Sequence, residues 1–309
     1  MPSTIEEYLA ELRSQLAGED PALVQDALYD AEEFLRSETA AAGSEPEAAF
    51  ATAVERYGTP DEVAAAYRDA EITVSKALRA PAQHKQRSWI GRFFGVVADP
   101  AAYGALFYML LALATGTIYF SVVVTGLSMS LGLAVLIIGI PFFLLFVAVV
   151  RAISLAEGRL IEALLGERMP RRPRLAPAST GEGMVARVKA WFTDYRTWTT
   201  MLYMVLQLPL GIIYFTLMVT GLATSVALVI SPVLQRAYHI PMFIDGTYGY
   251  YTHPAAYPLV MALGVLGFFL TLWLAKGIGI VHGMWAKAML VGRFDGPATT
   301  QTQSAQVPQ

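Results

Sequence analysis

The sequence predicts an all-α integral membrane protein, with four transmembrane helices in two duplicated hairpins and a small cytoplasmic helical bundle. This prediction rests on long charge-free segments, an internal repeat and an acidic N-terminal region with helical periodicity. Residues 101–150, 197–235 and 258–275 contain no charged side chain. A helix that meets water needs a polar face, whereas a bilayer core of about 30 Å needs about 20 apolar residues per helix. The first segment is therefore long enough for two passes.

An internal repeat relates two halves of the membrane region. Residues 99–127 align with residues 194–222 without a gap, and 13 of the 29 positions are identical. The later segments align at a larger offset, which pairs Arg151 with Lys276. The second copy therefore carries an insertion that starts near residue 234.

The repeat and the charge pattern together place the spans. We expect them at roughly 103–125, 128–150, 199–221 and 256–281. Gly139-Ile-Pro141 is predicted to kink the second span. Whether the apolar segment 222–234 crosses the membrane, dips into it or caps it is left open by the sequence.

Residues 1–80 are predicted to form a bundle of three or four short amphipathic helices. Thr4 and Glu7 have the spacing of a capping box, and Asp20 with Pro21 is typical of an N-cap followed by a proline at the first helical position. An apolar stripe at helical spacing follows, made of Leu23, Ala27, Leu28, Ala31, Phe34 and Leu35. The first 71 residues hold 17 acidic side chains against four arginines, a balance of −13.

Three short runs in this region resemble the HAAS domain, an α-helical signalling domain associated with helix-turn-helix regulators. They are Tyr8–Leu12, Tyr29–Leu35 and Ala53–Ala64, and the last contains the sequence Tyr-Gly-Thr-Pro-Asp-Glu-Val-Ala. The resemblance implies a cytoplasmic domain of a membrane protein that is linked to PadR-like transcriptional regulators.

The two hairpins resemble the bacterial Putative sensor membrane domain, which is found ahead of histidine-kinase modules. The resemblance covers about 95–168 and 187–293, and it is carried by the runs Leu206–Phe215, Val219–Leu222, Ile138–Pro141 and Glu162–Gly166. The first copy departs from the pattern, because Ala114 stands where the second copy has Pro209. No kinase segment follows Arg293, so we expect the HAAS-like domain to be the input or output module.

Loop charge predicts the orientation. The segment 151–196 carries nine Lys and Arg residues, the turn near 125–131 carries none, and the loop 235–257 has only Arg236. By the positive-inside rule, both termini are expected in the cytoplasm of a multi-pass protein of the cell membrane. The expected organisation is a HAAS-like domain at 1–80, a basic amphipathic segment with hairpin repeat 1 at 81–168, a Pro/Arg linker at 169–186, hairpin repeat 2 at 187–293 with the outer loop 235–257, and a disordered tail at 294–309.

Two groups of residues are candidates for a functional site. The candidates for hairpin packing or a ligand pocket are Gly116, Tyr119, Phe120, Thr125, Gly126, Gly211, Tyr214, Phe215, Thr220 and Gly221. The candidates for sensing in the outer loop are His239, Tyr248, Tyr250, Tyr251 and His253. Close helix packing and an interfacial aromatic belt are the simpler interpretations of these two groups.

Three further polar residues lie in or near the spans. Gln207 is expected to bond another helix. Lys276 is expected to reach the water at the inner end of its span, and His282 is expected to lie in that same interface.

The sequence contains no Walker loop, dinucleotide fingerprint, nucleophile elbow or paired zinc histidines. We therefore expect no catalytic activity, no cofactor and no metal site. The predicted function is a membrane-embedded sensor that couples an envelope or membrane-borne signal to a PadR-like regulator through residues 1–80. A transporter or permease subunit and a non-catalytic membrane scaffold are the alternatives. The expected partners are the lipid bilayer and that regulator, a homodimer is left open, and no direct binding of nucleic acid is expected of so acidic a domain.

Overall fold

The computed structural model describes residues 2–42, 46–78, 89–134, 138–172, 194–245 and 248–291. The chain forms two compact units. The first contains residues 1–81, together with 170–178 and 291–309, and the second contains residues 82–169 and 179–290. Most of the linker, the second basic aromatic run at 187–192 and the expected tail lie outside the described residues.

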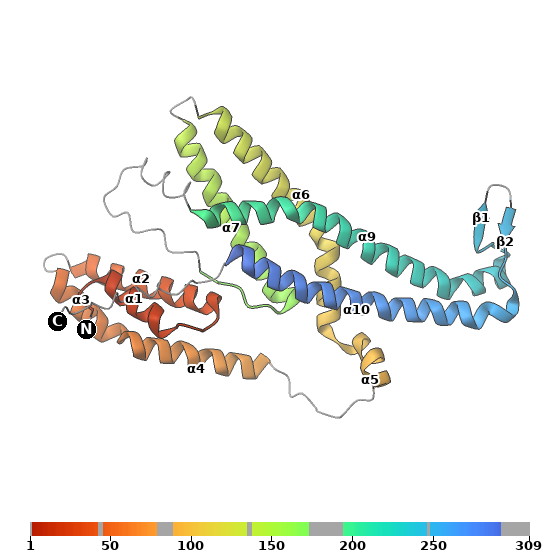
Figure 1. Cartoon of the computed structure of the whole chain (residues 1–309), viewed down its shortest axis with the longest axis horizontal. Coiled ribbons are helices and arrows are strands. Elements are labelled where there is room, and N and C mark those ends of the chain that lie inside the picture. Colours follow the sequence, from red (N-terminus) through yellow and green to blue (C-terminus); the bar gives the residue numbers. More distant parts are fainter. Residues whose placement is uncertain are drawn as a thin grey trace, which may run out of the picture. The chain divides into compact units, whose positions relative to one another are not determined.

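The first unit is the expected helical bundle, whose four helices are coloured red to orange in Figure 1. They are α1 (Ile5–Gln15), α2 (Pro21–Ala42), α3 (Pro46–Tyr57) and α4 (Pro60–Leu78). Both predicted caps form: the Thr4 hydroxyl oxygen accepts from the Glu7 amide at 3.2 Å, and the Asp20 carboxylate accepts from the Ala22 amide at 2.8 Å. These bonds satisfy backbone N–H groups that the first helical turn leaves unpaired.

A tyrosine in α1 ties the bundle together. Tyr8 is fully buried in the core with Leu12 and Leu16, against the apolar stripe of α2. Its hydroxyl donates to the Gly58 carbonyl oxygen at 2.8 Å, in the turn between α3 and α4. Burial raises the pKa of Tyr8 well above its ordinary value, so the hydroxyl remains a donor over the physiological range.

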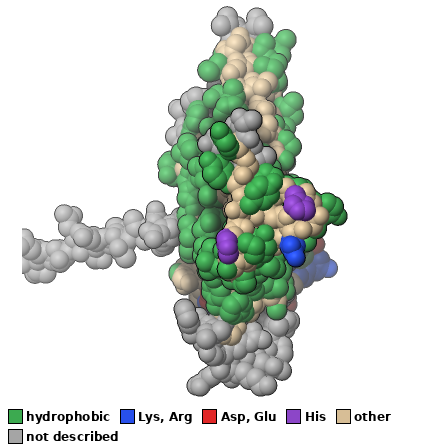
Figure 2. Space-filling view, turned by 90° about the vertical axis from the view of Figure 1, so that its right-hand side faces the viewer, with side chains coloured by type: hydrophobic (Ala, Val, Ile, Leu, Met, Phe, Trp, Pro, Cys, Tyr) green, Lys and Arg blue, Asp and Glu red, His purple; other side chains and the backbone are tan. Residues whose placement is uncertain are grey.

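The second unit contains four helices that are long and apolar enough to cross a membrane. They are α6 (Pro100–Gly132), α7 (Gly139–Leu165), α9 (Tyr195–Tyr238) and α10 (Tyr257–Leu290). Helix α6 packs against α7, α9 packs against α10, and the two hairpins meet mainly where α6 crosses α9, as Figure 1 shows. In Figure 2, hydrophobic side chains cover most of the described part of the face in view. The integral membrane fold class is confirmed.

Two predicted boundaries of these helices are wrong. The turn expected near 125–131 is helical, because α6 continues to Gly132 and α7 starts only at Gly139. Pro141 therefore lies in the first turn of α7, where its missing N–H costs no hydrogen bond, and it does not kink a span. Nothing between residues 125 and 131 stops a helix in an apolar solvent, since the backbone there can be satisfied only within the helix.

The segment 222–234, which the sequence left open, belongs to α9. This helix runs for 44 residues and passes through Pro209 and Pro232. After it, β1 (Phe243–Asp245) pairs antiparallel with β2 (Tyr248–Tyr250), and the short helix η2 (Pro254–Ala256) leads into α10. The insertion in the second repeat thus lengthens α9 and adds a small strand hairpin.

A short element precedes the first hairpin and packs on the last helix. Helix α5 (Trp89–Phe94) and the 3-10 turn η1 (Gly95–Ala98) come directly before α6. The Trp273 indole N–H donates to the Phe93 carbonyl oxygen at 3.1 Å, and the Phe94 ring meets Phe269 edge to face. The first basic aromatic run is therefore fixed to α10 through its aromatic residues.

Candidate functional site

The two hairpins approach closely at a pair of glycines. A Cβ atom on Gly116 of α6 would lie 2.6 Å from the Gln207 carbonyl oxygen, and one on Gly211 of α9 would lie 2.4 Å from the Ala112 carbonyl oxygen. Because both obstacles are backbone atoms, neither can move aside as a flexible side chain could. The two glycines are equivalent in the repeat, so the crossing of α6 and α9 is built symmetrically.

Beside this crossing lies a fully buried carboxylate, Glu157 of α7. Three tyrosine hydroxyls donate to it: Tyr108 to Oε1 at 2.6 Å, Tyr203 to Oε1 at 2.9 Å and Tyr119 to Oε2 at 2.7 Å. A carboxylate in an apolar medium is costly unless it is paired or fully hydrogen-bonded. Tyr108 and Tyr119 come from the same hairpin as Glu157, whereas Tyr203 comes from the other, so the carboxylate joins the two hairpins.

A buried imidazole completes the cluster. His282 of α10 is 2 % exposed, and its Nε2 lies 2.7 Å from the Tyr108 hydroxyl and 3.3 Å from the Tyr203 hydroxyl. Its Nδ1 lies 3.2 Å from the Tyr214 hydroxyl. The expectation that His282 lies in the water interface is therefore wrong, because three tyrosine hydroxyls bind its ring nitrogens inside the bundle.

Gln207 is the remaining polar member, and it is fully buried. Its Nε2 donates to the Tyr108 hydroxyl at 3.1 Å, which confirms the expected bond to another helix. Its side-chain carbonyl oxygen, Oε1, has no hydrogen-bond partner among the described residues. We define the tyrosine network by seven side chains: Tyr108, Tyr119, Glu157, Tyr203, Gln207, Tyr214 and His282.

The tyrosine network follows the internal repeat except at Gln207, which aligns with Ala112, and at one pair of ionisable residues. The first offset pairs Tyr108 with Tyr203 and Tyr119 with Tyr214. The second offset, which pairs Arg151 with Lys276, also pairs Glu157 with His282. Each hairpin thus supplies two tyrosines from its first helix and one ionisable group from its second, an acid in one copy and a base in the other.

The repeat also exchanges ion pairs between the hairpins. Asp99, the N-cap of α6, lies 2.6 Å from Lys276 of α10, and its equivalent Asp194, the N-cap of α9, lies 3.8 Å from Arg151 of α7. The cation expected to reach water thus meets a carboxylate from the other hairpin. The ammonium of Lys276 lowers the pKa of Asp99 through their hydrogen bond.

The predicted packing residues separate into two sets. Tyr119, Tyr214, Gly116 and Gly211 lie in the network or at the crossing. Gly126 faces the Phe146 ring and its equivalent Gly221 faces Thr271, each within its own hairpin. By contrast, Thr125, Thr220 and Phe215 are exposed on the outside of the unit, and Phe120 is partly exposed, so these four do not enclose a pocket with the others.

The outer-loop candidates make separate local contacts. His239 ends α9 in a left-handed conformation, with φ 53°, and its carbonyl oxygen accepts from the Tyr251 hydroxyl at 2.8 Å. The Nδ1 of His253 accepts from the Ala255 amide at 3.3 Å, at the start of η2. Tyr248 and Tyr250 are exposed on β2. Among the described residues no three acidic or histidine side chains are placed to hold a metal ion.

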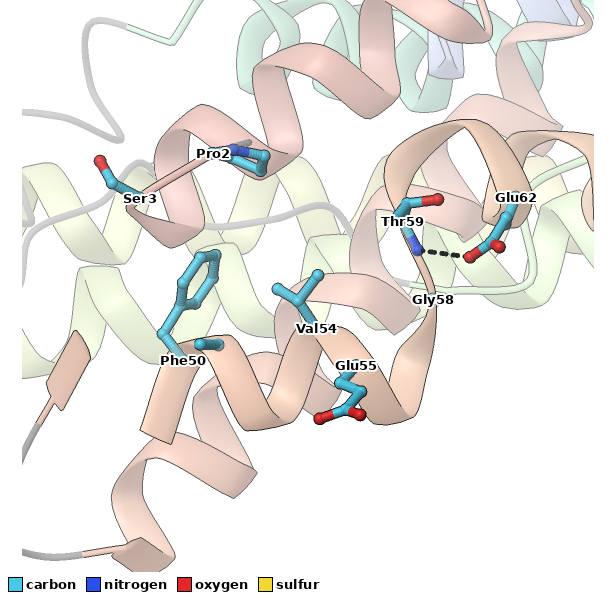
Figure 3. A pocket seen from close by; sticks show the side chains of 9 residues that line it. Pro2, Ser3, Phe50, Val54, Glu55, Gly58, Thr59 and Glu62 are labelled. Atoms are coloured by element: carbon cyan, nitrogen blue, oxygen red, sulfur yellow. Dashed lines mark hydrogen bonds between the residues drawn. The ribbon is translucent and has the colours of Figure 1, made fainter. Parts of the chain in front are cut away.

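The N-terminal unit has a pocket of about 560 Å³. Phe50 and Val54 of α3 form its apolar wall, and Glu55 and Glu62 stand at its edge, as Figure 3 shows. Glu62 also accepts from the Thr59 amide at 2.9 Å.

Comparison with protein families agrees with this architecture. The Putative sensor model matches residues 108–290, which is more than half of the chain and includes every member of the tyrosine network. The chain belongs to the Putative sensor family. The HAAS model matches residues 7–66, which lie within the N-terminal unit. No curated protein and no solved structure matches the chain.

The sequence predicts three of the seven members of this site, Tyr119, Tyr214 and Gln207. Glu157 is not among the residues that it singles out, and His282 is expected in the water interface. A usable signal was present, because Tyr108 and Tyr119 are 11 positions apart, about three helical turns, and both copies keep this spacing. Aligning the second helices of the repeat then brings an acid opposite a histidine.

Proposed function

We propose that this membrane sensor passes a membrane-borne or envelope signal from its hairpins to its HAAS domain, which then binds or releases a PadR-like regulator. Both termini are placed in the cytoplasm by this proposal, in line with the charge of the loops. The chain performs no catalysis of its own. The observation that carries the proposal is a contact made by the residues that follow α7, the helix that bears Glu157.

These residues, Pro170–Arg172, group with the N-terminal unit and lie against α2. The Asp26 carboxylate accepts from the backbone amides of Arg171 and Arg172, both at 2.9 Å. Gln25 donates to the Arg172 carbonyl oxygen at 2.8 Å. We call Pro170–Arg172 the strap.

The Arg172 side chain adds charge to this contact. Its guanidinium lies 2.9 Å from the Asp30 carboxylate and 5.7 Å from the centre of the Tyr29 ring. Both interactions are ones that arginine makes better than lysine. An acidic face of the HAAS domain therefore already binds a basic extended segment of the chain itself.

The strap provides the coupling that a sensor needs. Only a few residues separate the end of α7 at Leu165 from Pro170, so a displacement of α7 changes the tension on the strap. A regulator with a basic segment would compete for the same face, and electrostatic attraction to a domain with a balance of −13 would speed its approach. Release of the strap then becomes the output signal.

The test uses the full chain in lipid nanodiscs and a purified PadR-like regulator. Arg172→Glu leaves the α2 face intact but repels it from the strap, so the regulator should bind at least threefold more tightly than to the wild type. Arg56→Glu makes the same change of charge on α3, where Arg56 pairs with Glu38, and should leave the affinity unchanged. Absence of regulator binding to both the wild type and Arg172→Glu would refute the proposal.

A permease is the second candidate, because the tyrosine network puts ionisable groups inside the bundle, where transporters carry their relays. It makes a different prediction. Proteoliposomes with a pH gradient would show a proton or solute flux that Glu157→Gln abolishes. A sensor would show no flux above empty liposomes.

A further inference from the structure

With Glu157 as a carboxylate, which can only accept, the hydrogen bonds of the tyrosine network point to one neutral tautomer of His282. Tyr108 gives its single proton to Glu157, so its oxygen must accept from His282 Nε2–H and from Gln207. When His282 is a neutral imidazole, its unprotonated Nδ1 accepts from the Tyr214 hydroxyl. This assignment follows from the inventory of donors and acceptors, and it leaves the network with one negative charge, on Glu157.

No cation among the described residues touches Glu157 to balance that charge. The groups that face Glu157 and His282 are Tyr108 and Tyr119 from α6, Tyr203, Tyr214 and Gln207 from α9, and the Trp285 ring from α10. The nearby cations Lys276, Arg151 and Lys287 each have a carboxylate partner, in Asp99, Asp194 and Glu167. A buried charge that no opposite charge balances remains costly even when it is hydrogen-bonded.

We propose that the tyrosine network is a proton-binding site: it takes one proton from water onto His282 Nδ1 and thereby converts a buried anion into a neutral Glu157–imidazolium pair bridged by Tyr108 and Tyr203. The N–H bond that forms at Nδ1 is the only covalent change, and the network charge goes from minus one to zero. The ligand that the site takes is therefore the proton.

Proton binding changes how the hairpins are joined. The Tyr214 hydroxyl, which donates to Nδ1 in the neutral state, must turn and accept from the new N–H. The bonds from Nε2 to Tyr108 and Tyr203 become charge-assisted, and such bonds are roughly twice as strong as neutral ones. Protonation therefore strengthens the bond from His282 to Tyr108, which belongs to the other hairpin. At the same time it reverses the direction of the bond between His282 and Tyr214, which belong to the same hairpin.

This inference rests on the proposed function only for its biological role, in which proton binding is one signal that the sensor detects. The site itself can be tested without any regulator. ¹⁵N-histidine NMR of the full chain in nanodiscs reports the tautomer and the charge of each imidazole. The sequence has four histidines, and His239→Asn and His253→Asn, at two sites outside the network, identify their own signals.

The expected result is a His282 signal of the Nε2–H neutral tautomer at alkaline pH and of the imidazolium at acid pH. Glu157→Gln should lower the pH at which His282 takes up its proton by at least one unit, because it removes the anion that favours the cation. Tyr214→Phe should also lower that pH, but by less, because the bond that it removes is stronger to the imidazolium than to the neutral ring. An Nδ1–H neutral tautomer, or the same titration in Glu157→Gln as in the wild type, would overturn the proposal.

A second measurement covers the case in which a variant folds poorly. The chain has no cysteine, so Leu131→Cys on α6 and Tyr248→Cys on β2, both exposed, can carry spin labels on an otherwise native background. The distance between the labels should shift over the pH range in which His282 titrates. An unchanged distance while His282 titrates would overturn the coupling to the hairpins.

Discussion

The two hairpins share one arrangement of helices, tyrosines and glycines, but they differ in the ionisable residue on their second helix. Each places two tyrosines 11 residues apart on its first helix and a glycine between them at the crossing. On the second helix, the first copy has Glu157 and the second has His282. A duplicated site with the same group in both copies would be two acids or two bases in one cavity, whereas this exchange makes an acid and a base that share their tyrosines. The difference shows how a symmetric scaffold can hold a site with two charge states.

Removing the Glu157 carboxylate should cause the largest loss of stability. Glu157→Ala leaves three buried tyrosine hydroxyls without their acceptor, and breaking a buried charged network by removing one partner costs about 3–5 kcal/mol. Glu157→Gln keeps one acceptor oxygen and the shape of the side chain, so it should cost clearly less. Unfolding in mild detergent, followed by circular dichroism, measures both. No loss of stability in Glu157→Gln would mean that Glu157 only fills space.

Replacing the two glycines at the crossing should cause the next largest loss of stability, and the loss should be similar in the two copies. Gly116→Ala and Gly211→Ala each push a methyl group into a backbone carbonyl of the other helix, and overpacking of this kind costs about 1–3 kcal/mol. Gly277→Ala on α10 is the matched control, because nothing lies within 4 Å of its added Cβ. Helix propensity alone makes Gly→Ala neutral or stabilising, so an equal loss of stability in the control would mean that the clash at the crossing is not the cause.

Replacing the equivalent tyrosines Tyr119 and Tyr214 should lower the stability by different amounts, which separates the roles of the two hairpins. Tyr119→Phe removes a 2.7 Å bond to a carboxylate, and bonds to charged groups contribute about 1.5–3 kcal/mol. Tyr214→Phe removes a 3.2 Å bond to a neutral imidazole, and neutral bonds between membrane helices average about 0.6 kcal/mol. Unfolding above neutral pH should therefore rank Tyr119→Phe as the more damaging change. The reverse ranking would place the charge on His282 rather than on Glu157.

The exchanged ion pairs should give the smallest effects. Lys276→Met loses the 2.6 Å pair with Asp99, and Arg151→Met loses the 3.8 Å pair with Asp194. Both pairs are partly exposed, so each contributes about 0–1 kcal/mol, with Lys276→Met the larger. Because Lys276 lowers the pKa of Asp99, that contribution is complete above the ordinary pKa of an aspartate and is lost as the pH falls through the lowered value. Stability of the wild type and of Lys276→Met should therefore converge in acid, and a constant difference would contradict the pairing.

The N-terminal unit was largely predictable because its signals are local. The hydroxyl of Thr4, the carboxylate of Asp20 and the glycines at positions 18 and 58 act on the backbone within a few residues, and the structure uses them as expected. The turn of the first hairpin was misplaced for the opposite reason. In lipid a helix continues until the bilayer or another helix ends it, so Gly126 became a packing position instead of a turn.

Composition and periodicity along the chain are enough to identify a membrane protein with an internal duplication, and to find the glycines and tyrosines that the two copies share. That Glu157 and His282 lie in the same network could not be predicted in this way, because it depends on how the two hairpins cross. Glu157 and His282 are 125 positions apart in the sequence, and Tyr108 and Tyr203 link them in the structure. A buried carboxylate needs hydrogen-bond donors, and here the packed helices supply them.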